Sequence, residues 1–191
     1  MSDHPGYVAG RWYAPYGMMG LATGNSMNTI RFTLLTIEER VTISDLGARV
    51  TTVSAGGLFG LAIYAMSATT KLPTGTPLAS VMGLSTATAT AVTGALAANV
   101  QLEPGQYWGA VIVDNTTAIF HAVSGGSGVM LTTIGDATAT NTLSTGTNAL
   151  AALSITGHNY ATGFTDVSAS TFAAISTTAN AAFIVKVASV P

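Results

Sequence analysis

Residues that could carry out acid–base or metal chemistry are few and scattered in this sequence. His4, His121 and His158 are far apart, and none has a second histidine at a spacing typical of metal ligands. We expect structural or surface histidines, and pairing with a distant carboxylate stays open. The absence of cysteine excludes disulfides, thiolate nucleophiles and zinc sites that need cysteine.

The eight carboxylates form no acid–base pair in the sequence. Glu38 and Glu39 are adjacent, so on a strand they would point to opposite faces, and we expect a solvated turn. The aspartates lie in turn-like surroundings, where Asp usually hydrogen-bonds its own backbone; these are Asp45, Asp114, Asp136 and Asp166. The alternative is a calcium site built from Asp114, Asn115 and a distant loop, since calcium takes several oxygen ligands.

Sequence motifs of common enzymes are absent. Residues 124–128, SGGSG, approach the G-x-S-x-G pattern of a nucleophilic serine without matching it, and we expect a hairpin turn there. The sequence holds no phosphate-binding G-x-x-x-x-G-K-[ST] loop and no G-x-G-x-x-G between a strand and a helix. We therefore expect a protein that is not an enzyme, with no catalytic residues, cofactor or metal.

The densest aromatic cluster lies near the N-terminus, where Trp12, Tyr13 and Tyr16 follow Arg11. Exposed aromatic side chains anchor interfaces or stack on sugar rings, and Arg11 can add a cation–π or bidentate contact. The same rings can also fill the end of a β-sandwich. Three interpretations stay open: interface anchors, a plug of the core and a glycan platform.

The composition indicates assembly into something larger. Only 7% of the 191 residues are charged, against roughly 25% in ordinary soluble domains, while 48% are hydrophobic. The net charge is −2 and the six basic residues are scattered, which argues against nucleic acid as a partner. The longest strongly apolar run, Leu58–Met66, is far shorter than the ~18 residues of a spanning helix, so we expect no membrane partner. Surfaces so poor in charge are typical of buried contacts between subunits.

The stretch from Arg40 to Met66 organises the expected fold. Val41, Ile43 and Val50 set an alternating pattern, interrupted near residues 45–47, and a nearly continuous apolar strand runs from Leu58 to Met66. Residues 54–57, SAGG, predict the turn between them. Further strands are expected at the ranges Thr29–Ile37, Leu78–Leu84, Ala89–Leu96, Gln106–Asp114, Ala118–Val123 and Ala181–Val190.

These elements predict one all-β domain, a β-sandwich or jelly roll over residues 29–191, preceded by an irregular N-terminal arm over residues 1–28. We expect Ala118–Val123 to pair with Gln106–Asp114 through a turn at residues 115–116. Residues 67–78 are expected to form a loop, and Leu143–Leu153 a short helix. Residues 132–165 lack a clear pattern and are interpreted as a binding loop.

Several of these segments together carry a resemblance to a known group of proteins. They are GRWY at residues 10–13, TIRFTLLTI at 29–37, VTISDLGARVTT at 41–52, LAIYAM with PTGTPLAS at 61–80, LEPGQYWGAVIVD at 102–114 and FIVKVASVP at 183–191. The chain resembles structural proteins of tailed-bacteriophage virions that contain a β-sandwich or jelly-roll domain. The group includes capsid decoration (cement) proteins and tail-fibre domains.

The resemblance implies a homotrimeric decoration protein that binds the major capsid protein and stabilises the shell. It implies a place in the virion after assembly in the host cytoplasm, and no catalytic residues. The candidate interface anchors are Arg11, Trp12, Tyr13 and Tyr16. The alternative is a tail-fibre or receptor-binding domain that recognises host surface glycans.

Overall fold

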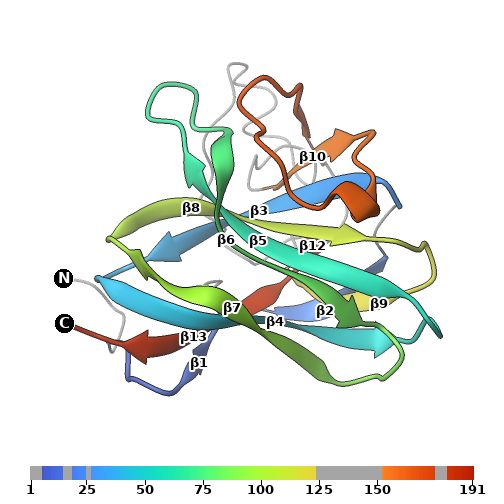
Figure 1. Cartoon of the computed structure of the whole chain (residues 1–191), viewed down its shortest axis with the longest axis horizontal. Coiled ribbons are helices and arrows are strands. Elements are labelled where there is room, and N and C mark those ends of the chain that lie inside the picture. The colour runs from blue at the N-terminus through green and yellow to red at the C-terminus, as the bar shows by residue number, and fades with distance from the viewer. Residues whose placement is uncertain (1–5, 15–18, 25–26, 124–151, 175–179) are drawn as a thin grey trace.

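The computed structural model describes residues 6–14, 19–24, 27–123, 152–174 and 180–191, which form two antiparallel β-sheets packed face to face (Figure 1). These residues contain one short 3-10 helix, η1 (Tyr160–Thr162), and no α-helix. The strands are β1 (Trp12–Tyr13), β2 (Met19–Gly24), β3 (Thr29–Ile37), β4 (Val41–Thr52), β5 (Leu58–Met66), β6 (Pro73–Ser85), β7 (Ala91–Leu102), β8 (Gly105–Val113), β9 (Ile119–Val123), β10 (Ala152–Thr156), β11 (Ala173–Ala174), β12 (Asn180–Ala181) and β13 (Phe183–Ser189). The all-β sandwich predicted from the sequence is confirmed.

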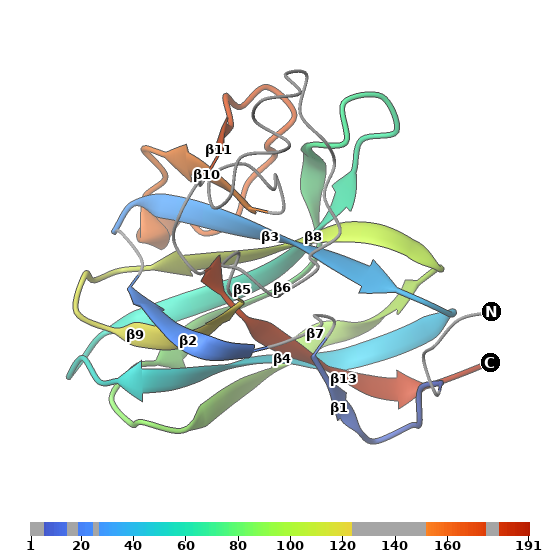
Figure 2. The ribbon, with the colours of Figure 1, turned by 180° about the vertical axis from the view of Figure 1, so that it is seen from behind.

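Most strands that are neighbours in a sheet are not consecutive in the chain. One sheet has seven strands in the order β1-β13-β4-β9-β12, with β2 paired to β9 and β7 paired to β4. The other has six strands in the order β11-β10-β3-β8-β5-β6. Figure 2 shows the same two layers from behind, with β4 and β13 in one layer and β3 and β8 in the other.

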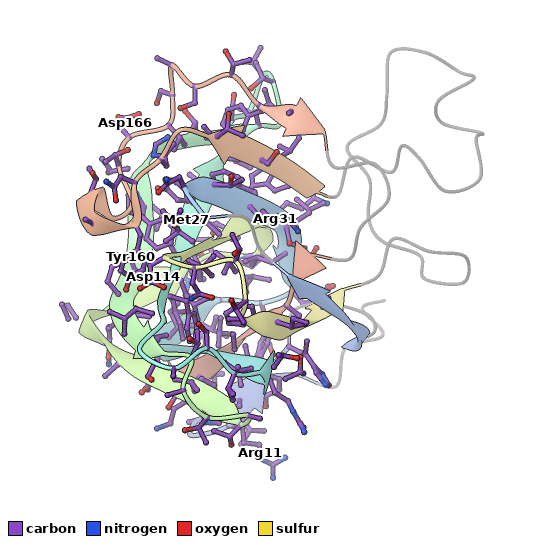
Figure 3. The ribbon with its side chains drawn as sticks, turned by 90° about the vertical axis from the view of Figure 1, so that its right-hand side faces the viewer. Arg11, Met27, Arg31, Asp114, Tyr160 and Asp166 are labelled. Atoms are coloured by element: carbon purple, nitrogen blue, oxygen red, sulfur yellow. The ribbon has the colours of Figure 1, made fainter. Side chains whose placement is uncertain are left out.

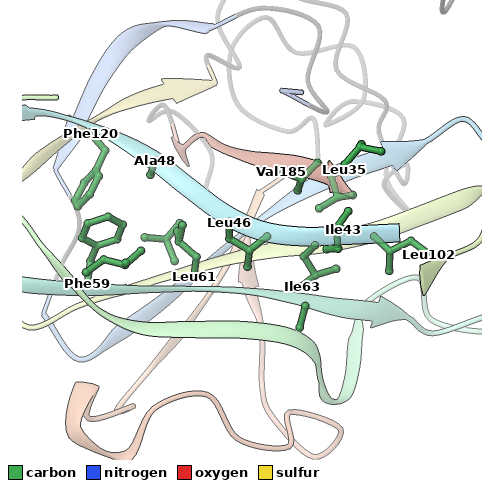
Figure 4. Packing of buried hydrophobic residues seen from close by; sticks show 14 of the residues in the cluster. Leu35, Ile43, Leu46, Ala48, Phe59, Leu61, Ile63, Leu102, Phe120 and Val185 are labelled. Atoms are coloured by element: carbon green, nitrogen blue, oxygen red, sulfur yellow. The ribbon is translucent and has the colours of Figure 1, made fainter. Parts of the chain in front are cut away.

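The main hydrophobic core fills the space between the sheets. Alternate residues of each strand point inward, as the two-residue period of a strand requires. The rings of Phe59 on β5 and Phe120 on β9 meet edge to face, with their centroids 5.0 Å apart. Figure 4 shows this contact at one end of the core, with aliphatic side chains such as Leu46, Leu61 and Ile43 continuing it.

A second hydrophobic cluster covers the outer face of the six-stranded sheet. The segment 157–172, between β10 and β11, packs over that face and forms what we call the cover, so β5 is buried on both sides. Trp108 is fully buried there, and its Nε1–H donates to the Lys71 carbonyl at 2.9 Å. The Tyr64 hydroxyl donates to the Thr165 carbonyl at 2.9 Å. This double burial explains why Leu58–Met66 is almost continuously apolar.

Local patterns placed several strands correctly. The prediction for Thr29–Ile37 is confirmed with the same bounds, and β4 and β5 are confirmed within Arg40–Met66. The expected interruption near residues 45–47 is a shift in the β4 register beside Asp45. The two strands lie in different sheets and face each other across the core.

The predicted partner of Ala118–Val123 is wrong. Strand β9 pairs with β2, β4 and β12 in the seven-stranded sheet, while β8 pairs with β3 and β5 in the other. The Asn115 side chain accepts hydrogen bonds from the Thr117 and Ala118 N–H groups, which builds a turn where the chain crosses between sheets. A turn signal shows that the chain reverses, but it does not show which sheet the next strand joins.

Three further expectations need correction. Residues 1–28 are not wholly irregular, because β1 and β2 pair with β13 and β9; such short, glycine-punctuated strands give no readable period. The loop expected at residues 67–78 ends early, since β6 begins at Pro73. Residues 143–151 of the expected helix lie outside the described residues, and Ala152–Thr156 is a strand held by β3. The division into an arm and a domain stays a prediction.

Candidate functional site

The N-terminal segment 6–13 lies against its own domain. Tyr7 is buried, and its backbone N–H donates to Glu39 Oε1 at 2.6 Å. The Gly10 N–H donates to the Val187 carbonyl at 2.7 Å, and the Val187 N–H donates to the Arg11 carbonyl at 2.9 Å. The described part of the expected arm is therefore attached to the sheet edge by backbone hydrogen bonds.

The predicted anchor residues separate onto two sides of this edge. Tyr13 packs against the main core, and its ring meets that of Tyr7 edge to face at 4.9 Å. Because neighbouring side chains on a strand alternate, Trp12 lies on the outer face of the seven-stranded sheet, where it is 37% exposed. Arg11 is exposed, and Figure 3 shows its side chain extending away from the sheets. Tyr16 lies outside the described residues, and the interface role of all four residues stays a prediction.

Trp12 is one end of a surface that we call the open face. The open face is the outer side of β1, β13, β4 and β7, and no other described segment covers it. The register sets the residues on either side of Gly47 in three rows that run across the strands. The first row is Trp12, Lys186, Asp45 and Ala95; the second is Ile184, Gly47 and Thr93; the third is Arg49 and Ala91.

The centre of the open face is low because Gly47 has no side chain. A Cβ placed on Gly47 would lie 2.9 Å from Thr93 Cγ2 and 3.3 Å from Ile184 Cγ1. The side chains of Thr93 and Ile184 therefore occupy the space on either side of the glycine. Along β7 the exposed positions are small, with Ala91, Thr93 and Ala95 in succession. Another surface can therefore approach the sheet closely over Gly47 and the outer positions Ala91, Thr93 and Ala95 of β7, where no side chain is larger than that of threonine.

The charges of the open face are few. Lys186 Nζ lies 3.7 Å from Asp45 Oδ2, and the Ser44 hydroxyl donates to the same carboxylate at 2.6 Å. Arg49 is exposed on the same strand as Asp45, on the other side of Gly47. Asp45 was expected to sit in a turn bonded to its own backbone; it lies instead within β4, at the register shift.

Carboxylates elsewhere serve local structure. Asp114 Oδ1 accepts from the Leu58 N–H at 2.8 Å and from Asn115 Nδ2 at 2.8 Å, so it joins the end of β8 to the start of β5 where a calcium site was the alternative. Asp166 Oδ1 accepts from the Ser168 N–H, and hydrogen bonds to Ser168 hold the pKa of that carboxyl below its usual range. Figure 3 shows Asp114 and Asp166 at separate points on the molecule.

Glu103 is exposed, and hydrogen bonds from Arg40 and Gln101 lower the pKa of its carboxyl. His121 lies on β9 with its backbone carbonyl bonded to the Ala182 N–H, and His158 follows β10 with its N–H bonded to the Asn28 carbonyl. Among the described residues no group of three or more His, Asp or Glu side chains could hold a metal ion. His4, Asp136 and residues 124–128 lie outside the described residues.

Sequence reasoning missed two features of this region. Tyr7 gave no signal beyond being one more aromatic residue near the glycine-rich start. The three rows of the open face depend on pairing among β1, β4, β7 and β13, which are far apart in the chain. The alternating small residues of Ala89–Leu96 were a usable signal, because they indicate one exposed strand face without large side chains.

No protein-family model matches the chain, and no curated protein matches it significantly. In the part of the chain that the structure describes, no helix has the length and apolar character needed to cross a bilayer.

Proposed function

We propose that the chain is a structural protein of a tailed-bacteriophage virion. In this proposal it is a homotrimeric capsid decoration protein with a jelly-roll-like sandwich that binds the major capsid protein and stabilises the shell. It is assembled in the host cytoplasm and acts without catalysis or cofactor. The motif resemblance suggests the class of particle, and the chemistry of the described surface is compatible with a role in contacts.

The observation that carries the proposal is the open face. It has small neutral residues at Gly47 and along β7, with Ile184 beside the glycine and the charges of Asp45, Lys186 and Arg49 as its main polar features. A cement protein acts by burying such area at seams between subunits, which contributes ~25 cal/mol per Å² before the costs of association. An exposed sheet face with small side chains suits a protein surface better than a small substrate, which is usually bound in a concave site.

The test compares particles that contain this chain with particles assembled without it. Both are heated in buffer of low ionic strength while DNA release is followed with an intercalating dye. We expect release at a lower temperature from the particles that lack the chain, and recovery when the purified protein is added back. Equal resistance of the two particles would reject the cement role.

A second candidate is a tail-fibre or receptor-binding domain that recognises host glycans. It is favoured by Trp12, which is 37% exposed and lies across from Lys186 on an edge strand. An exposed indole beside charged groups can stack on a sugar ring while those groups bind hydroxyls. Binding on a glycan array that is lost in W12A, together with location of the chain at the tail, would support this candidate over the first.

A further inference from the structure

The open face has a charge pattern that fits a second copy of itself. Asp45 and Arg49 lie on the same strand, two residues to either side of Gly47, and carry opposite charges. Each is therefore about 7 Å from the glycine along β4, on the same face of the sheet. Arg49 is exposed there, and Asp45 is half-buried beside Lys186.

We propose that the open face binds the open face of a second copy around a two-fold axis that runs across the strands through the row Ile184–Gly47–Thr93. This axis places the two copies face to face with their β4 strands antiparallel. Asp45 of one copy then faces Arg49 of the other, and the same pair forms again on the far side of the axis. A two-fold interface is self-complementary in this way by symmetry.

The charges of Asp45 and Arg49 favour this axis over a two-fold axis parallel to the strands. A two-fold axis parallel to the strands would set Asp45 against its own copy and Arg49 against its own copy. Like charges in contact across an interface are strongly unfavourable, so that arrangement is disfavoured. Packed sheets hold their strands within about 30° of each other, and the long Arg49 side chain can span the resulting offset.

The shapes also agree with the axis across the strands. On β7 that axis sets Ala95 against Ala91 of the other copy and Thr93 against Thr93, so small residues meet small residues. Strands β4 and β7 are each 12 residues long, and with β13 and β1 they present about 600 Å² per copy. This is close to the roughly 800 Å² per partner of a standard interface.

The inference goes beyond the proposed function, because it assigns the open face to a contact between two copies and leaves contact with the shell protein to the rest of the surface. In a decoration protein that is also a trimer, a two-fold contact joins copies that belong to different trimers. The purified protein in solution is therefore the right sample. A failure of this inference leaves the heat test of the particles unaffected.

The experiment is sedimentation equilibrium over a range of protein concentrations. We expect the wild-type mass to be twice that of T93R, in which two arginines meet at the axis. The matched control T76R adds the same charge at an exposed position of β6 and should keep the wild-type mass. Circular dichroism and thermal melting establish that each variant is folded.

A charge-reversal series tests the orientation. The R49D variant places a second carboxylate against Asp45 of the other copy and should weaken self-association about 10-fold or more. The triple variant D45K/K186E/R49D reverses all three charges, so it restores the facing pairs and keeps the pair within each chain. It should recover the wild-type affinity.

Three results would overturn the proposal. The first is a wild-type protein that does not self-associate at any concentration tested. The second is a T93R variant with the wild-type mass. The third is an R49D variant that associates as tightly as wild type, since that excludes the axis across the strands. Loss of particle binding by T93R with a monomeric wild type would assign the open face to the shell protein and also reject a second copy.

Discussion

The two sheets of this sandwich differ in what lies on their outer faces, and each face holds one of the chain's two tryptophans. Trp108 on the six-stranded sheet is fully buried in the cluster beneath the cover, with its indole N–H bonded to the Lys71 carbonyl. Trp12 on the seven-stranded sheet is 37% exposed on an edge strand. The covered face is packed against another part of the chain, whereas no other described segment covers the open face.

The difference is also visible at two glycines. A Cβ on Gly60 of the covered face would lie 3.1 Å from the Phe164 ring and closer still to Met82, so the cover rests directly on the β5 backbone. On the open face Gly47 is flanked by side chains of its own sheet only. Both glycines lie in central strands. Gly60 is covered by another part of the chain, whereas Gly47 contacts only its own sheet among the described residues.

The largest expected effect comes from removing the buried tryptophan. W108A leaves a large cavity under the cover and an unpaired Lys71 carbonyl, and we expect it to lower the free energy of unfolding by about 3–5 kcal/mol. Urea denaturation followed by far-UV circular dichroism measures this loss. A loss below about 1 kcal/mol would mean that the cover contributes little to the stability of the sheet.

An intermediate effect is expected at Tyr64. Its hydroxyl bonds to the Thr165 carbonyl of the cover, so Y64F should cost about 1 kcal/mol at neutral pH. Burial, with a smaller effect of Asp166, raises the pKa of the Tyr64 hydroxyl above its ordinary value of 10.0. The stability linked to this raised pKa is fully present below pH 10 and is lost as the pH rises through the higher folded value.

Urea denaturation at neutral pH and above pH 10 tests both parts. Y64F should lose less stability than wild type over that interval, although Tyr7, Tyr107 and Tyr160, whose pKa values burial also raises, keep part of the alkaline loss. Y107F is the control for the neutral-pH measurement, because its hydroxyl bonds to the Glu103 carbonyl at an exposed position and its removal should cost less than that of the Tyr64 hydroxyl. If Y64F and wild type lose stability in parallel, Tyr64 ionises freely and the cover is not closed over it.

The smallest effect is expected at the other tryptophan. W12A removes a partly exposed side chain at an edge strand, so the isolated chain should lose about 1 kcal/mol or less. Acrylamide quenching offers a second measurement: in W108F the remaining Trp12 should be quenched strongly, and in W12F the remaining Trp108 weakly. Equal quenching of the two indoles would contradict the difference in solvent exposure between Trp12 and Trp108.

Local sequence patterns were sufficient for the class of the fold and for several strands. Alternation placed Thr29–Ile37 and most of Phe183–Ser189, because a strand with one buried face must repeat every two residues. The nearly continuous apolar run placed β5, although only the tertiary structure showed that this strand is buried on both sides. The expectation from composition that the surface contacts other subunits stays a prediction.

Only the tertiary structure decided which strands share a sheet. Asp45, Ala95 and Lys186 meet in one row although they are distant in the chain, and no local signal encodes that register. The same limit hid the burial of Tyr7 against the β3–β4 turn and misassigned the partner of β9. The two-residue period of side chains depends on a few neighbouring residues, so the sequence alone determined several of the strands. The pairing of strands and the coverage of each sheet face depend on long-range packing, so only the tertiary structure decided them.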